Sequence, residues 1–206
     1  RAHILADGRV GRFGAKAAVA SLREMVALAF REELGVTNPL APNERGLYDQ
    51  PLPPGTDPAA DPEIDLAAVD ATVAEIRAFT IPFKTEIDGP GGGGGSDEGS
   101  ALFAQVGCVK CHVSPIYSDL LLHDLGGALQ PNTDPCFMGA PANEIRTAPL
   151  IGLRFMGANY MHAGNAETLL NAIWGFHGGE AQAPRQAFLA LPLAQRNKLL
   201  AFVGGL

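Results

Sequence analysis

The chain has 206 residues, of which 47% are hydrophobic and 18% charged, enough apolar material for one globular core or two small ones. Its 15 basic and 22 acidic residues give a formal charge of -7, which disfavours nucleic acid as a partner. No apolar run reaches the roughly 18 residues of a membrane span, so no such span is expected. The start at Arg1, without a methionine, indicates a processed or partial chain.

Two packing helices are expected in the N-terminal part. Residues 15–34 carry apolar side chains at helical spacing with charged residues opposite, and Gly35 ends this helix. Seven prolines fall within residues 39–62, which predicts an extended connection without regular elements. A second helix is expected to open at Asp61-Pro62-Glu63 and to stop before Pro82.

A flexible joint follows at residues 89–100, which read GPGGGGGSDEGS. Successive glycines leave the backbone unrestrained, so this segment is predicted to be a linker, native or engineered. Ser96 or Asp97 can cap the next helix. The apolar residues of that helix are expected to face the motif that follows: Leu102, Phe103 and Val106.

Residues 107–112 read GCVKCH, in which two cysteines lie one helical turn apart. Their sulfurs can then point to one side, where each forms a thioether with one haem vinyl group, and His112 meets the iron from the proximal face. The alternative is a zinc site, which needs four ligands. Beyond the motif only Cys136 and scattered histidines are available, and no second CxxC exists, so covalent haem is the favoured interpretation.

Short elements are expected downstream of His112. Residues 117–127 could form one or two helical turns, with Asp119 and His123 at i and i+4. In that arrangement Asp119 or Asp124 would orient the imidazole of His123 near the surface.

Two helices are expected closer to the end of the chain. Residues 167–174 form the first, with Asn165 as its cap and four apolar residues turned inward: Leu169, Leu170, Ile173 and Trp174. The last helix runs from about Leu193 to Phe202 and ends in Gly-Gly.

Six blocks in this order carry a family resemblance: GRFGAKAAVASLR, GCVKCH, YSDLLLHDLG, EIRTAPLIGL, YMHAGNAETLLNAI and HGGEA. Together they resemble the di-haem oxidoreductase or thiol oxidoreductase family, relatives of bacterial di-haem cytochrome c peroxidases, over almost the entire chain. The family is similar to a two-domain protein with one CxxCH in each half, and here the first such half is absent. Its HDGRA block reads HAGNA at residues 162–166, so an acidic and a basic side chain are missing.

The opposite face of the iron has several candidate ligands: His123, His162, His177, Met138, Met156 and Met161. His177 is favoured, because it follows a predicted helix within GFHGG, where glycines permit close backbone approach to a flat ring. Met156 or Met161 is the next candidate for the sixth ligand, and the remaining alternatives are another side chain or an open position. The resemblance agrees on the place, since the family's sixth ligand lies just beyond the helix after the HDG block, although it is usually methionine.

Several other residues are expected around the cofactor. Arg146 and Arg154 suit haem propionates because of their forked donors, although surface salt bridges would also explain them. Phe176 and Met161 complete the residues expected to bind the cofactor, with His112 and His177 as metal ligands and no catalytic residue assigned. If the sixth position is open, Glu180, His162 or Glu144 could supply an acid or base. Cys136 and Met138 are interpreted as structural.

The sequence therefore predicts a mostly α-helical fold: a cytochrome c-like haem domain at 101–206, a Gly-rich linker at 89–100, and a helical interdomain segment with a Pro-rich connection at 1–88. One covalent haem c and one-electron transfer within a larger redox assembly are expected. The alternatives are the C-terminal part of a di-haem peroxidase, and a docking subunit whose haem stabilises the fold.

Partners and location follow from these interpretations. Redox proteins, other subunits or an upstream haem domain are the expected partners, and the resemblance adds calcium between the halves as a candidate ion. Since thioether haem attachment takes place outside the cytoplasm, a periplasmic or extracellular location is expected.

Overall fold

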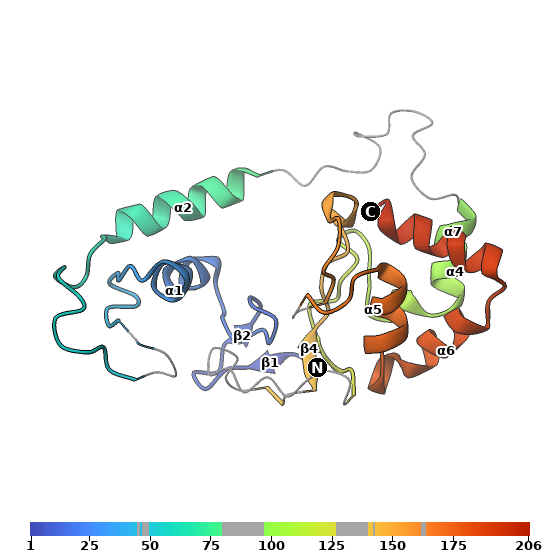
Figure 1. The fold of residues 1–206 in the computed structure, drawn as a ribbon, viewed down its shortest axis with the longest axis horizontal. Helices are drawn as coiled ribbons and strands as arrows, with labels where there is room; N and C mark the ends of the chain where they lie inside the picture. Colours follow the sequence, from blue (N-terminus) through green and yellow to red (C-terminus); the bar gives the residue numbers. More distant parts are fainter. Residues whose placement is uncertain (45, 47–49, 80–96, 127–139, 142, 162–163) are drawn as a thin grey trace. The chain divides into compact units, whose positions relative to one another are not determined.

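The computed structural model describes residues 1–44, 46, 50–79, 97–126, 140–141, 143–161 and 164–206 (Figure 1). The predictions for most of the Gly-rich joint and for Cys136, Met138 and His162 lie outside the described residues. The chain divides into two compact units. The N-terminal unit spans His3–Thr80 and Thr133–Gly139, and the C-terminal unit spans Arg1–Ala2, Ile81–Asn132 and Ala140–Leu206.

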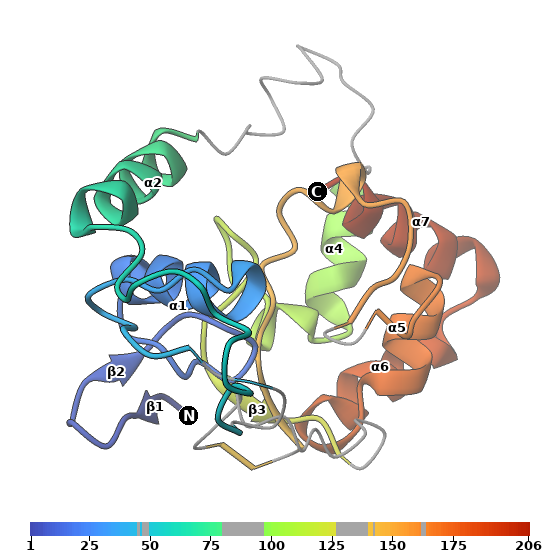
Figure 2. The same cartoon turned by 60° about the vertical axis from the view of Figure 1, so that its left-hand side comes forward.

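Two helices form the core of the N-terminal unit (Figure 2): α1, Leu22–Leu34, and α2, Leu66–Ala78. Their buried contacts are Val26 and Ala27 against Val69 and Val73. The short strands β1 (His3–Ile4) and β2 (Val10–Gly11) pair antiparallel in the same unit.

The first helix begins later than residue 15, so that part of the prediction is wrong. The Ser21 side chain accepts a hydrogen bond from the backbone amide of Glu24, and the Glu24 side chain accepts one from the backbone amide of Ser21. This capping box starts the helix at Leu22. Ala17 has a φ of 49°, which no helix residue adopts. The end at Gly35, with φ 66°, is confirmed. The second helix likewise starts at Leu66, because Asp65 caps it.

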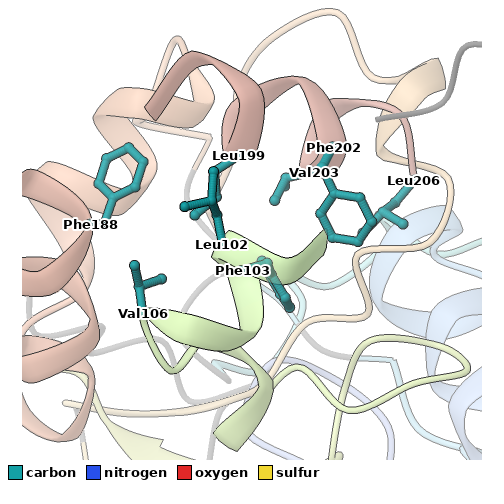
Figure 3. Packing of buried hydrophobic residues seen from close by; sticks show 8 residues of the cluster. All are labelled: Leu102, Phe103, Val106, Phe188, Leu199, Phe202, Val203 and Leu206. Carbon is teal, nitrogen blue, oxygen red and sulfur yellow. The ribbon is translucent and has the colours of Figure 1, made fainter. Parts of the chain in front are cut away.

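The C-terminal unit is built on α4 (Asp97–Gln105) packed against α7 (Leu193–Gly204). These two helices share a hydrophobic core with α6 (Gln182–Ala190), shown in Figure 3. The eight buried residues of this core are Leu102, Phe103, Val106, Phe188, Leu199, Phe202, Val203 and Leu206. Helix α5 (Leu169–Phe176) and the antiparallel strands β3 (Leu122–Asp124) and β4 (Glu144–Arg146) complete the unit. With six α-helices and four short strands described, the expectation of a mostly α-helical protein is confirmed.

Several sequence predictions for this unit are wrong. Helical turns were expected at residues 117–127, but His123 lies in strand β3, whose pairing with β4 could not be seen locally. Thr168, not Asn165, caps α5, because its side chain accepts from Asn171. Leu170 and Trp174 are 39% and 57% exposed rather than turned inward. Helix α6 was not predicted at all. No helix among the described residues is long and apolar enough to cross a membrane.

Candidate functional site

The cysteine motif follows directly from the core helix α4. Gly107, with φ 94°, turns the chain into the 3-10 turn Cys108–Lys110, and the amide of His112 donates to the Cys108 carbonyl. Cys108 and Cys111 are free thiols. Burial raises the pKa of Cys108 to about 12 and raises that of Cys111 as well, so both sulfurs stay protonated at neutral pH.

His112 is held in one tautomer. Its Nδ1 lies 3.0 Å from the carbonyl oxygen of Tyr117, and since a carbonyl only accepts, Nδ1 carries the proton. The lone pair is therefore on Nε2. Burial lowers the pKa of His112, only partly offset by the carbonyls of Tyr117 and Ala148, which keeps the ring neutral. A neutral imidazole with a fixed Nδ1–H is the form that binds a metal.

His177 repeats this arrangement from the other side of the unit. It follows the last residue of α5 as the C-cap, and its Nδ1 donates to the carbonyl of Ala172 at 2.8 Å. Burial lowers the pKa of His177, and the positive charge of Arg185 lowers it further. The second ring is thus also neutral, with its Nε2 lone pair available.

The two rings lie close together, with centroids 6.5 Å apart and planes inclined by 39°. Imidazoles bound on opposite sides of one metal ion, with metal–nitrogen bonds of about 2 Å, bring their centroids roughly 6 Å apart. The observed separation of the centroids is close to this value. Of the predicted ligand residues, the structure therefore brings His112 and His177 together.

The glycines after His177 make a close contact with the backbone of another segment. A Cβ on Gly178 would lie 2.7 Å from the Leu125 carbonyl oxygen, and one on Gly179 would lie 2.3 Å from the Asp124 oxygen. The amide of Gly178 donates to Leu125 at 3.1 Å. These glycines allow close approach to the backbone at the end of β3, because two chain segments meet there.

A hydrogen-bonded charge cluster, Asp119–His123–Glu180, lies beside this contact. Both ring nitrogens of His123 lie 2.8 Å from carboxylate oxygens, Nε2 from Asp119 and Nδ1 from Glu180. Burial lowers the pKa of His123, but the bonds to Glu180 and Asp119 outweigh burial and the net shift is upward. Carboxylates only accept, so the ring is a doubly donating imidazolium. The expected pairing of His123 with Asp119 occurs, but His123 lies in strand β3 and Asp119 in the turn before it, rather than both on one helix.

This cluster ties the two histidine segments together. The amide of Asp119 donates to the Cys111 carbonyl at 2.8 Å, next to His112. At the other end, Glu180 lies three residues beyond His177 and also accepts from the Asp124 amide at 3.1 Å. The cluster therefore helps to fix the separation of the two rings.

A cation could in principle use the same groups. Ligand atoms of Cys111, Asp119 and His123 lie within 4.8 Å of one another. However, both His123 nitrogens already donate to carboxylates, and Cys111 keeps its proton because burial and the charges of Asp119 and Glu180 raise its pKa. The donor set suits an ion-paired histidine better than a metal ion.

The remaining predicted residues are spread around the unit. Phe176 ends α5 beside His177, and Glu144 and Arg146 are the ends of β4. Arg154 lies over the ring of Phe155, 5.5 Å from its centroid. Burial lowers the pKa of Arg146.

The methionine alternatives lie near Arg154 in the chain. Met156 ends the 3-10 turn Leu153–Phe155 and is 47% exposed, and Met161 has a φ of 70°. The histidine ring that lies beside His112 is that of His177, with 6.5 Å between the centroids.

Sequence reasoning missed Arg185. It lies on α6, and its Nε is buried without a hydrogen-bond partner among the described residues. No motif marks this position, and only the helical pattern of residues 182–190 could have drawn attention to it.

A mostly helical unit with a CxxCH turn and two neighbouring neutral imidazoles has the features of a haem-related redox domain. Residues 113–206 match the family model described as "Di-haem oxidoreductase, putative peroxidase". The match starts at the residue after His112 and confirms the resemblance to the di-haem oxidoreductase family over the C-terminal part of the chain. Comparison with curated proteins and with solved structures gave no match.

Proposed function

We propose that the C-terminal unit is a c-type cytochrome domain, in which Cys108 and Cys111 hold one haem covalently and His112 and His177 bind its iron. The observation that carries this proposal is the close pair of imidazoles, with centroids 6.5 Å apart, each with Nδ1 on a backbone carbonyl. Two unrelated segments fix both rings in the metal-binding tautomer, which a purely structural pair of histidines would not require.

The cysteines fit covalent attachment. Each thiol adds across one vinyl group, so a carbon–sulfur bond forms, the thiol hydrogen moves to the neighbouring carbon, and no oxidant is needed. The thiols are protonated because burial raises the pKa of both. Neither cysteine is in a disulfide, so both are available.

With the group bound, the iron supplies one-electron chemistry between its ferric and ferrous states. His112 and His177 would both hold the iron, and His177 would thereby keep water and small substrates away from it. The domain is then suited to electron transfer rather than to binding a substrate at the metal.

Electron exchange needs an accessible cofactor edge, and the motif turn lies at the surface. Val109 and Val113 are 42% and 44% exposed on either side of Cys111. A redox protein can approach this turn, and the formal charge of -7 favours a cationic partner. We place the protein in the periplasm or outside the cell, where thioether haem is assembled.

Spectroscopy of the protein purified from a host that assembles c-type cytochromes tests the proposal. The expected result is a mass increased by one haem and a low-spin, six-coordinate signature in electron paramagnetic resonance. A bare polypeptide mass contradicts covalent attachment. A five-coordinate, high-spin iron in the resting protein contradicts the ligation by His177.

The family match favours a second candidate function, in which this chain is the electron-transferring part of a di-haem enzyme. The second haem would belong to a partner or an upstream domain with its own CxxCH, and a calcium ion could lie between the halves. Peroxidase activity of this chain alone, compared with its activity together with such a domain, separates the two. Activity only in the combined protein supports the enzyme. If both samples are inactive, simple electron transfer is the supported function.

A further inference from the structure

The buried edge of α6 holds a cationic group whose hydrogen bonding is incomplete. The Nε of Arg185 is buried, and among the described residues no oxygen accepts its hydrogen. A buried donor without an acceptor destabilises the folded protein, and the cost is larger for a charged group. Proteins seldom keep such a group without a function, so its location needs an explanation.

Arg185 lies on a helix that reaches both segments of the proposed haem site. Helix α6 begins at Gln182, five residues after His177, and it contacts α5, which His177 caps. Its neighbour Pro184 reaches the cysteine turn, since a Cβ on Gly107 would lie 3.6 Å from the Pro184 Cγ. Arg185 is thus near the segments that carry both axial ligands, while its Nε has no partner there.

The partner that suits a guanidinium is a carboxylate, which accepts two parallel hydrogen bonds. No described carboxylate accepts from the Arg185 Nε. The haem brings two carboxylates of its own, its propionates. We propose that Arg185 binds a propionate of the haem, an inference that rests on the proposed cytochrome function and adds a cofactor-binding residue to it.

This assignment differs from the one expected from sequence. Arg154 already stacks on Phe155 at 5.5 Å, and both Arg146 and Arg154 make further interactions within the described structure. Arg185 satisfies its Nε only when a carboxylate arrives with the cofactor. Binding of the haem then removes the cost of the buried donor, so Arg185 favours the loaded protein.

The test uses the haem-loaded protein and three variants. Arg185→Gln removes the charge, Arg185→Lys keeps the charge but loses the fork, and Arg196→Gln is the matched control, since the Arg196 Nε on α7 is also buried without a described partner. Haem content, midpoint potential and the pH dependence of that potential are measured for each. A positive charge paired with a propionate disfavours the ferric state, so its loss lowers the potential.

We expect Arg185→Gln to lower the midpoint potential and to raise the pH at which the potential responds to propionate protonation. Arg185→Lys should lie between this variant and the wild type, and Arg196→Gln should match the wild type. Unchanged potential and pH response in Arg185→Gln overturn the inference. The inference is also overturned if circular dichroism shows that neither Arg185→Gln nor Arg185→Lys folds, because the role of Arg185 would then be structural. If the wild-type protein contains no haem, the proposed function itself is wrong.

Discussion

The imidazoles of His112 and His177 lie with their centroids 6.5 Å apart, although the two residues are 65 positions apart in the sequence. Each ring is fixed by a hydrogen bond from Nδ1 to a carbonyl oxygen, so both Nε2 lone pairs are available without rearrangement. The site is therefore preorganised for two axial bonds, which makes its response to substitution specific.

Replacing His177 should change the iron in two distinguishable ways. His177→Ala opens one axial position, so we expect high-spin iron with the haem still attached through both cysteines. His177→Met should keep low-spin iron and raise the midpoint potential, because a thioether favours the ferrous state relative to imidazole. Visible and electron paramagnetic resonance spectra report both outcomes. Low-spin iron in His177→Ala, with the spectrum of a methionine ligand, would transfer the role to Met156 or Met161.

The attachment can be tested one sulfur at a time. Cys108→Ala or Cys111→Ala leaves a single thioether, so we expect the haem to stay bound and its reduced pyridine spectrum to shift, while the double variant loses covalent haem. Cys136→Ser is the matched control and should retain the wild-type mass and spectrum. If Cys136→Ser abolishes the cofactor and a Cys108 variant does not, the assignment of the thioethers is wrong.

The Asp119–His123–Glu180 cluster should make stability depend on pH. The pKa of His123 is raised from its ordinary value of 6.5, so its contribution is complete below 6.5 and is lost as pH rises through the folded value. The pKa values of Asp119 and Glu180 are lowered from 3.8 and 4.5, so their contributions are complete above 4.5 and are lost as pH falls through the folded values. The full effect falls between pH 4.5 and 6.5.

The corresponding variant is His123→Gln, which keeps a polar side chain but cannot become a cation. We expect it to lower the free energy of unfolding by about 1–2 kcal/mol at pH 5.5, a modest value because the Glu180 side chain is 56% exposed, and by less at pH 8.5. Thermal melts at several pH values measure this. Lys198→Gln, which breaks the exposed pair with Glu98, should show a small effect that does not change between these pH values. A pH-independent loss in His123→Gln contradicts the imidazolium.

The core that supports the motif helix should respond to cavity formation. Leu199 on α7 is fully buried in the cluster with Leu102 and Phe103, so Leu199→Ala should cost about 2–5 kcal/mol of unfolding free energy. Leu193, on the same helix but 65% exposed, is the control, and Leu193→Ala should stay within about 0.5 kcal/mol of the wild type. Urea unfolding monitored by far-ultraviolet circular dichroism compares them. Equal losses would show that the packing between α4 and α7 is not as the structure has it.

The candidate site was largely predictable where its chemistry is local. CVKCH contains both cysteines and the histidine proposed as a ligand within five residues, and His177 stood out because it follows a helical pattern and precedes two glycines. The contact of His123 with Glu180 could not be predicted, since it joins residues 57 apart through the docking of one backbone on another. Arg185 was missed for a similar reason, because a buried donor without an acceptor is visible only once the helices are packed.

The fold shows the same division. The ends of helices with strong caps, such as Gly35, were predictable, whereas the start of α1 depended on the capping box at Ser21 and on the left-handed residue Ala17. The strand pair of β3 with β4 is only three residues long on each side, too short for an alternating pattern to register.

The glycine pair after His177 provides the last prediction. Gly179 has a φ of 50°, and a Cβ there would lie 2.3 Å from the Asp124 carbonyl oxygen, so Gly179→Ala must push the two backbones apart. Because the same segment carries His177, we expect a weaker iron–His177 bond, seen as a mixture of low-spin and high-spin iron. Gly175→Ala is the control within α5: a Cβ there meets nothing within 4 Å, and alanine favours the helix, so low-spin iron and equal or higher stability are expected. A Gly179→Ala protein with wild-type spectra would show that the docking of this segment does not position His177.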